Sequence, residues 1–420
     1  MLRAMNDLVF ADPNTFSGQL KLGRGIAAQR APYVAGAADW VYQCVIADAR
    51  WDPQTEERGS YLARIIHRLA LSTAPLAAHL GTAPDAEDVW LTLDVLAILG
   101  LVGRSDALAV VRRYAVAGEH WSVAIDALGS TGAWKLPGVV DGLAEEVVAM
   151  RGDAELDEAI TGSWEPWTSF GRDQPRIAAI LHDRDQRRRI TTRDPDDAVT
   201  AGAAPADLID RAYAADGRSR RMALDELGKQ GNLLLLDLAA DVRLRNDAGW
   251  IPGMARALQH LGDRAVSAAR TWADGGDTTL AELGVEILAR CGDRRDAPTL
   301  LNAVTRAAQA GAWCALESPA RGPGRIGHRD AADLLRHIWE VTEHSVSRHA
   351  ILEGLAGCAP RTAEACASEG LDDCEPHVQR TACGIVPDTA VIRKRLTELR
   401  DDPLAPDVAE AAAQRLSPRR

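Results

Sequence analysis

The chain lacks a long uninterrupted hydrophobic run, and it has little positive charge. Its longest apolar segment, residues 89–102, contains Asp94 and is too short to cross a bilayer, so we expect no membrane association. The 48 Lys and Arg residues are outnumbered by 60 Asp and Glu residues, which gives a formal net charge of −12. Affinity for phosphate backbones comes mainly from clustered positive charge. The charge balance therefore makes nucleic acid an unfavoured partner, although it does not exclude one.

Motifs for hydrolysis, metal binding and nucleotide binding are also missing. Neither Gly-x-Ser-x-Gly nor His-Glu-x-x-His occurs. Cys374-x-x-His377 has no second pair at zinc-finger spacing. The segment from Gly18 to Gly25 has the glycine spacing of a phosphate-binding loop but lacks its Lys and its Ser or Thr. We expect a glycine-rich turn there, and we predict no metal, no cofactor and no catalytic residue.

The seven cysteines form an odd set in a chain without a recognisable secretory leader over residues 1–12. This pattern predicts reduced, buried thiols in a cytoplasmic protein. The basic residues are almost all arginine, and alanine is abundant. Such a composition is typical of a GC-rich bacterial genome, so we give arginine no special recognition role on this ground.

A period of about 30 residues runs through much of the sequence. Turn glycines Gly231, Gly262 and Gly292 are 31 and 30 residues apart, and each follows a segment with apolar residues at helical spacing. A glycine fits the left-handed conformation after a helix, and an Asp that follows can cap the next helix. Each unit therefore predicts two amphipathic helices, neither of which can bury its apolar stripe without a neighbour.

These units resemble HEAT repeats, in particular the short type called PBS-lyase HEAT-like repeats, over residues 60–160 and 205–417. The resemblance implies an all-α fold without β-sheet, an α-solenoid of stacked antiparallel helical hairpins. It also implies a non-enzymatic scaffold or adaptor that binds another protein along its surface, although repeat type says little about function.

Breaks in the period suggest the domain organisation. We expect an N-terminal cap or arm with a first helix over residues 1–50 and repeats over 51–162. An irregular junction with Trp164 and Trp167 follows over 163–204, and a second set of repeats over 205–417. Within that set, the Gly- and Pro-rich segment 316–329 is predicted to be an inserted loop.

The inserted loop is our leading binding-site prediction. Insertions in solenoids often lie on the binding face, and this one carries Arg321, Arg325, His328 and Arg329 in a chain of negative net charge. Arginine side chains suit the carboxylate or phosphate groups of a partner. The alternative is a solvated connector without a binding role.

Two helices present polar stripes that we interpret as solvent-facing. In the first, which we expect to begin at Asp52, Arg64 and Arg68 lie on the polar face. In the second, a stripe from Asp333 to His344 has the spacing of a metal ladder, but metal sites need ligands from more than one direction.

One alternative function rests on a tryptophan and an aspartate. HEAT-like alkylpurine DNA glycosylases carry an Asp on a concave helix with Trp residues around it. Here Trp90 and Asp94 are one helical turn apart, and Trp164 or Trp167 could supply a second indole. A DNA-binding protein or alkylpurine DNA glycosylase with Asp94, Trp90 and Trp167 in its site is therefore the alternative. The acidic charge balance favours the protein scaffold.

Overall fold

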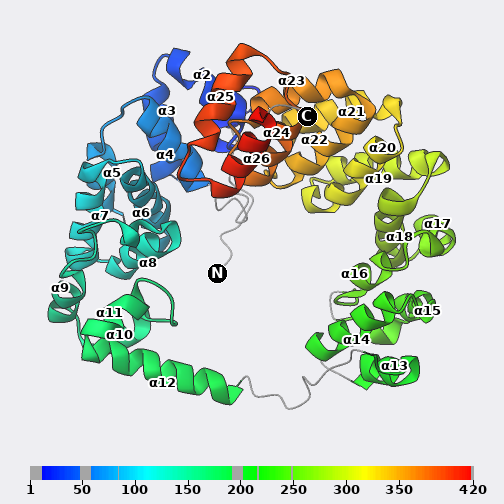
Figure 1. Cartoon of the computed structure of the whole chain (residues 1–420), viewed down its shortest axis with the longest axis horizontal. Coiled ribbons are helices and arrows are strands. Elements are labelled where there is room, and N and C mark those ends of the chain that lie inside the picture. Colours follow the sequence, from blue (N-terminus) through cyan, green and yellow to red (C-terminus); the bar gives the residue numbers. More distant parts are fainter. Residues whose placement is uncertain are drawn as a thin grey trace. The chain divides into compact units, whose positions relative to one another are not determined.

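The computed structural model describes residues 12–47, 58–83, 85–191, 202–214, 217–246 and 249–417. All regular secondary structure in these ranges is helical, which confirms the predicted all-α class (Figure 1). The start of the helix expected at Asp52 lies outside the described residues, as do residues 1–11 of the expected N-terminal arm. No helix in the described ranges is long and apolar enough to cross a membrane.

The chain divides into two compact units. Unit 1 comprises residues 1–193 and 367–420, and unit 2 comprises residues 194–366. The helices of unit 1 are α1 (Phe16–Lys21), α2 (Gly25–Arg30), α3 (Ala37–Ile46), α4 (Arg58–Arg68), α5 (Ala74–Leu80), α6 (Ala86–Leu101), α7 (Ser105–Ala117), α8 (Trp121–Thr131), α9 (Leu143–Met150), α10 (Asp153–Ala159), α11 (Trp167–Asp173), α12 (Pro175–Thr191), α24 (Pro376–Ile385), α25 (Ala390–Arg400) and α26 (Pro406–Leu416).

The helices of unit 2 are α13 (Pro205–Ala214), α14 (Gly217–Lys229), α15 (Leu234–Ala240), α16 (Met254–Gln259), α17 (Val266–Ala273), α18 (Thr278–Cys291), α19 (Ala297–Gln309), α20 (Glu317–Arg325), α21 (Ala332–Val341) and α22 (Ser347–Cys358). Helix α23 (Pro360–Gly370) contains the boundary between the units. In unit 2, helices two apart in the chain pack together: α14 on α16, α16 on α18, α18 on α20 and α20 on α22.

Two of the three turn glycines predicted in unit 2 have the expected conformation. Gly231 and Gly262 have the expected positive φ, whereas Gly292 is extended. The Asp293 side chain accepts a hydrogen bond from the backbone of Arg295 and so caps the short helix η6 (Arg294–Asp296). Leu258 and Leu288 are buried, as the helical periodicity predicts.

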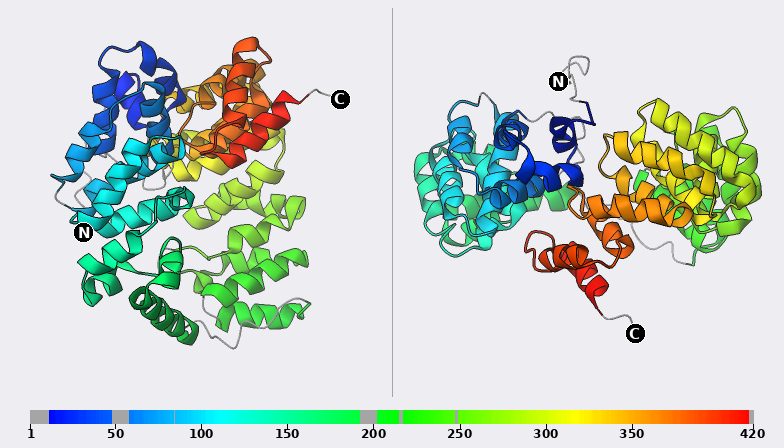
Figure 2. Two further views of the ribbon diagram at one scale, coloured as in Figure 1. Left: turned by 60° about the vertical axis from the view of Figure 1, so that its left-hand side comes forward. Right: turned by 90° about the horizontal axis from the view of Figure 1, so that it is seen from above.

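Unit 1 joins segments from the two ends of the chain. Arg24 forms a two-pronged hydrogen bond with Glu369, with Nε–Oε1 and Nη2–Oε2 distances of 2.9 and 3.0 Å, and both side chains are largely buried. The backbone N–H of Cys374 donates to the carbonyl oxygen of Gly23 at 2.8 Å. In Figures 1 and 2, the orange segment that leads to the C-terminal helices accordingly meets the blue N-terminal helices. The predicted block 205–417 is therefore divided, and its last part belongs to unit 1.

The contact between the N-terminal and C-terminal segments of unit 1 explains why glycine is needed at position 25. It also corrects the prediction that the polar face of α4 is exposed to solvent. A Cβ atom at Gly25 would lie 1.9 Å from the carbonyl oxygen of Glu369, so only glycine permits the close approach. Arg68 pairs with Asp372, and Arg64 pairs with Asp402 at 2.8 Å. The polar face of α4 is thus partly covered by the C-terminal segment, with Arg64 largely buried and Arg68 still exposed. Sequence spacing could not reveal this, because the partners lie more than 300 residues away.

The predicted irregular junction and the predicted loop are both largely helical. Helices α11 and α12 occupy most of residues 163–191 of the junction, and residues 192–201 lie outside the described residues. In place of the loop at 316–329, helix α20 runs through Pro323 and buries Pro319, Ala320 and Gly324. A Cβ atom at Gly324 would lie 2.4 Å from the carbonyl oxygen of Gly354 on α22. The glycines allow α20 to pack closely on α22, and this contact outweighs their poor helix propensity.

Candidate functional site

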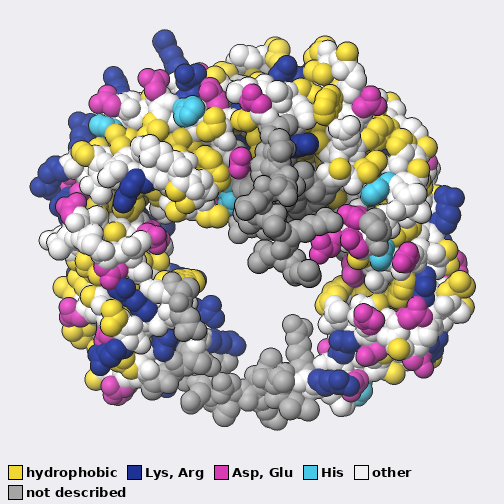
Figure 3. All heavy atoms as spheres, turned by 180° about the vertical axis from the view of Figure 1, so that it is seen from behind, with side chains coloured by type: hydrophobic (Ala, Val, Ile, Leu, Met, Phe, Trp, Pro, Cys, Tyr) yellow, Lys and Arg dark blue, Asp and Glu magenta, His cyan; other side chains and the backbone are white. Residues whose placement is uncertain are grey.

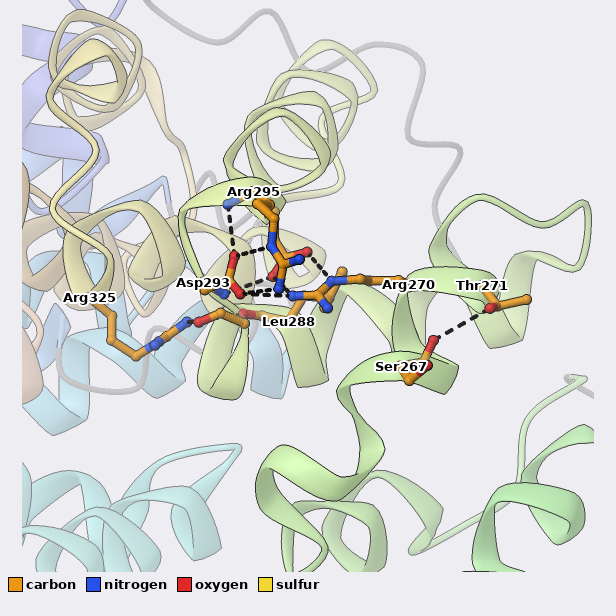
Figure 4. Close-up of polar contacts among 9 residues, drawn as sticks. Ser267, Arg270, Thr271, Leu288, Asp293, Arg295 and Arg325 are labelled. Carbon is orange, nitrogen blue, oxygen red and sulfur yellow. Dashed lines mark hydrogen bonds and ion pairs between the residues drawn. The ribbon is translucent and has the colours of Figure 1, made fainter.

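Two of the four predicted binding residues on α20 are held by the protein itself. The Arg325 guanidinium donates to the carbonyl oxygens of Ala289 at 2.9 Å and Leu288 at 3.2 Å, and also to that of Gly292 (Figure 4). These carbonyls lie at the C-terminal end of α18, where the last carbonyls of a helix have few backbone donors; that of Leu288 also accepts from the backbone N–H of Gly292 at 2.8 Å. Arg325 therefore caps α18.

Arg321 is paired with residues of α22. Its Nε atom lies 2.6 Å from Oε2 of Glu353, and its guanidinium also contacts the His349 imidazole. Arg321 and Arg325 line a cavity of about 400 Å³ together with Glu286. Because each guanidinium already has an internal partner, a ligand in this cavity would have to compete for both.

His328 and Arg329 lie apart from the other two predicted residues. With Arg294 they line a cavity of about 590 Å³, bounded also by Gly357 and Cys358 at the end of α22. Asp330 lies 4.0 Å from the His328 ring. The four residues predicted as one site thus line two separate cavities.

An ion-pair network adjoins the α18 end that Arg325 caps. Arg270 on α17 reaches Asp296 at 2.7 Å and Asp293 at 3.1 Å, and Arg295 also bonds Asp293 (Figure 4). The hydrogen bond from Arg270 lowers the pKa of Asp296, and the bond from Arg295 lowers that of Asp293. The network links neighbouring helices and has a structural role.

A cysteine, a histidine and a serine meet where η7 (Trp313–Leu316) lies against the start of α22. Cys314 Sγ lies 3.3 Å from His344 Nε2, and His344 Nδ1 lies 2.9 Å from Ser347 Oγ. Burial raises the pKa of the neighbouring Glu343 carboxyl, which accepts a hydrogen bond from Trp313. Cys314 also lines a cavity of about 720 Å³.

Sequence reasoning missed this cluster for two reasons. Helix α21 ends at Val341, so His344 does not continue the predicted polar stripe but is buried at 4% exposure. Cys314 was expected to be buried and is exposed. The only sequence signal was the break in the 30-residue period near residue 316, which we attributed to a loop.

The residues of the alternative site have mixed surroundings: Trp90 and Asp94 lie one turn apart on α6, as predicted, but Trp167 packs against other residues. Asp94 is buried, and a Cβ atom at Gly59 would lie 2.0 Å from its Oδ2. Trp167 is fully buried and packs edge-on against Trp121, with ring centroids 6.1 Å apart. The carboxyl beside Trp167 is that of Asp126 on α8, not that of Asp94.

Asp126 is an unusual carboxyl group. Burial raises its pKa, and hydrogen bonds from the indoles of Trp164 and Trp167 partly oppose that shift. The contact with Trp167 is a weak one, since Trp167 Nε1 and Asp126 Oδ1 each lack a partner with ordinary hydrogen-bond geometry. Trp167 is sealed in the core, so this arrangement offers no stacking surface on that side.

Exposed apolar side chains are concentrated in the first part of unit 2. Ten large apolar side chains are exposed in the described residues, and half of them lie between residues 213 and 250, whereas the others are scattered over unit 1. We name these five the 213–250 apolar set: Tyr213, Leu233, Leu234, Val242 and Trp250. The guanidinium of Arg243 lies 4.9 Å from the centre of the Tyr213 ring and bonds Asp241.

Charged side chains, unlike the exposed apolar ones, are not concentrated in one part of the sequence. On the face drawn in Figure 3, Lys and Arg side chains are interspersed with Asp and Glu, and no continuous basic stripe crosses its described residues. Within the described ranges, no group of three or more His, Cys, Asp or Glu side chains is arranged to hold a metal ion. Searches of family models, curated proteins and solved structures find no match for this chain.

Proposed function

We propose that this chain is a non-enzymatic, cytoplasmic helical scaffold that binds another protein through the 213–250 apolar set of unit 2. We also propose that its helices form solenoid stacks of the HEAT type. The packing of α14, α16, α18, α20 and α22 in succession supports a repeating layer, as does the 30-residue period.

The observation that carries the protein-binding proposal is the concentration of exposed apolar side chains. Trp250 is 54% exposed and Val242 is 66% exposed, and they lie eight residues apart in the chain. Scattered apolar side chains need no explanation on a protein surface, but a contiguous apolar patch often marks an interface, and we propose that the set contributes to such a patch. Tyr, Trp and Arg are also the side chains that most often dominate binding energy.

The chemistry of the set suggests the chemistry of its partner. Asp241 already pairs with Arg243 at 2.5 Å, so the charged groups nearest to Val242 neutralise each other. A partner therefore gains little by presenting a charge and more by presenting apolar side chains. We infer an apolar-faced segment of a protein, for which burial contributes about 25 cal/mol per Å² before the costs of association.

Affinity purification from the native host tests the proposal when three forms are compared. These are the unaltered chain, the double variant Val242→Asp with Trp250→Ala, and the control Val391→Asp, which alters an even more exposed apolar side chain on unit 1. We expect a protein that co-purifies with the unaltered chain and the control but is lost with the double variant. Equal recovery of every protein with all three forms would contradict the proposal.

The nucleic-acid alternative has weaker support. The net charge is −12, and Asp94 is enclosed by α4. We expect weak DNA binding that disappears at moderate salt, and no release of alkylated purines. Tight binding, or base release abolished by Asp94→Asn, would favour the alternative.

A further inference from the structure

Cys314 differs from the other cysteines in its exposure. Of the seven cysteines, five are buried, Cys291 is half-buried and Cys314 alone is exposed. Burial raises the pKa of Cys291, Cys358 and Cys383, which disfavours their reactive thiolate form. A small thiol-reactive molecule therefore meets Cys314 first.

The His344 ring is oriented so that it can donate to Cys314. The backbone N–H of Ser347 lies 3.2 Å from His344 Nδ1, and a backbone N–H can only donate. Nδ1 is therefore the acceptor, and the neutral ring carries its hydrogen on Nε2, 3.3 Å from Cys314 Sγ. In this tautomer His344 cannot remove the thiol proton, but its N–H can stabilise the thiolate.

Other contacts hold the two residues in place. Ser347 Oγ donates to the carbonyl oxygen of Trp313, the residue before Cys314, at 2.9 Å. His344 is buried in the loop just before α22, so its ring cannot readily turn away. The thiol is exposed while the group that donates to it is fixed, which is the arrangement of a positioned nucleophile.

The cavity beside the thiol carries excess negative charge. About 720 Å³ in volume, it is lined by Cys314, Glu282, Glu286, Glu317 and Arg306 among others. Glu286 accepts a hydrogen bond from Gln259 at 2.8 Å, which leaves its charge in place. Three carboxylates and one guanidinium favour a cationic ligand over an anionic one.

We propose that Cys314 is a site of thiol–disulfide exchange with small amine-bearing disulfides, which bind in this cavity. The Cys314 thiolate attacks one sulfur of the disulfide, a new S–S bond forms to Cys314, and the original S–S bond breaks. The second sulfur leaves as a thiolate and takes up a proton from solvent. The reaction needs no other oxidant, because the small disulfide is reduced as Cys314 is oxidised.

Two small disulfides of opposite charge test the choice of ligand. The full-length protein is incubated with cystamine, which is cationic, or with 3,3′-dithiodipropionate, which is anionic, and adducts are located by peptide mass spectrometry. We expect Cys314 to be modified first, and about tenfold faster by cystamine after correction for each reagent's rate with a free thiol. Glu282→Gln with Glu317→Gln should remove most of this preference. First modification at another cysteine, or equal corrected rates, would overturn the proposal.

Paired substitutions test the positioning role of His344. A glutamine at 344 can still donate an N–H to Cys314 and accept from Ser347, whereas a leucine can do neither. We expect His344→Gln to react within about threefold of the unaltered rate and His344→Leu to be slowed about tenfold. Equal rates for the two variants would overturn the role of His344. Should His344→Leu fail to fold, the comparison of reagents on the unaltered chain still decides the proposal.

Discussion

Each of the two units is stabilised internally by a different kind of contact. Unit 1 depends on contacts between residues more than 300 positions apart, such as Arg24 with Glu369 and Arg68 with Asp372. Ion pairs in unit 2, such as Arg245 with Asp277, join residues about one repeat apart. A repeat pattern predicts contacts of the second kind but carries no information about the first. The packing of neighbouring repeats can therefore be predicted from the sequence pattern, whereas the contact between the two ends of the chain cannot.

The units also differ in what they leave exposed. Unit 1 covers part of the polar face of α4 with its C-terminal segment, whereas unit 2 exposes the 213–250 apolar set and Cys314. A stack held by neighbour contacts can present its faces to partners, since no distant segment is needed to cover them. This contrast places the proposed binding functions in unit 2.

The largest expected effect is on the core of unit 2. Leu258→Asp places a carboxylate where the native side chain is 1% exposed, so we expect the free energy of unfolding to fall by about 4 kcal/mol or more. Urea titration measures the loss, and hydrogen exchange should localise it to unit 2. Leu234→Asp, at an exposed position, is the matched control and should leave stability unchanged. Equal losses for the two variants would show that our assignment of the core is wrong.

The second effect concerns the closure of unit 1. Arg24→Ala leaves the Glu369 carboxylate largely buried without its main partner, so we expect a loss of about 3–5 kcal/mol. Amide protection should fall together in α2 and in residues 367–374. Arg400→Ala removes an exposed pair with Asp401 and should cost no more than about 1 kcal/mol. Loss of protection in only one of the two segments would mean that they do not form one cooperative structure.

A third, smaller effect should appear in acid. Because Arg270 lowers the pKa of Asp296 in the folded state, this pair stabilises unit 2 above the ordinary aspartate value of 3.8. The contribution is lost as pH falls below that value and the carboxylate becomes protonated. We expect Arg270→Gln to cost about 1–2 kcal/mol at neutral pH and little at about pH 2. Urea titrations at both pH values check this, and a pH-independent cost would contradict the assignment.

The smallest expected effect is an increase in stability, caused by a substitution in unit 1. Burial raises the pKa of Asp126, so its ionised form destabilises the folded state at neutral pH. Asp126→Asn removes the charge but keeps an oxygen that can accept from the two indoles. We expect the melting temperature to rise by a few degrees at neutral pH and to change little in acid. A lower melting temperature at neutral pH would show that the charge is stabilising.

The sequence predicted the helical class and the core positions of unit 2, because helical periodicity and turn residues act over a few residues. Leu258, Leu288 and the Asp293 cap illustrate this. The prediction of a loop at residues 316–329 was wrong, because close contact between Gly324 and Gly354 stabilises helix α20, which helix propensity disfavours. The sequence also failed for Arg64 and Arg68 because their acidic partners lie at the other end of the chain.

The candidate sites were harder to predict. Arg321 and Arg325 look like free binding groups in the sequence, but their partners are Glu353 and backbone carbonyls about one repeat away. The cluster of Cys314 and His344 could not be found by spacing, because η7 and the start of α22 are brought together only by the fold. The exposure of Val242 and Trp250 also could not be predicted, because it depends on where neighbouring helices pack in the folded structure.

Site-specific photo-crosslinking in the native host tests the central claim most directly. A benzophenone amino acid is placed at residue 234 in the apolar set, or at residue 391 on unit 1, since both native side chains are exposed. The account predicts one crosslinked protein from position 234, absent from position 391 and lost when Val242→Asp is added. Crosslinks of equal yield from both positions, or a crosslink from 234 that survives Val242→Asp, would contradict it.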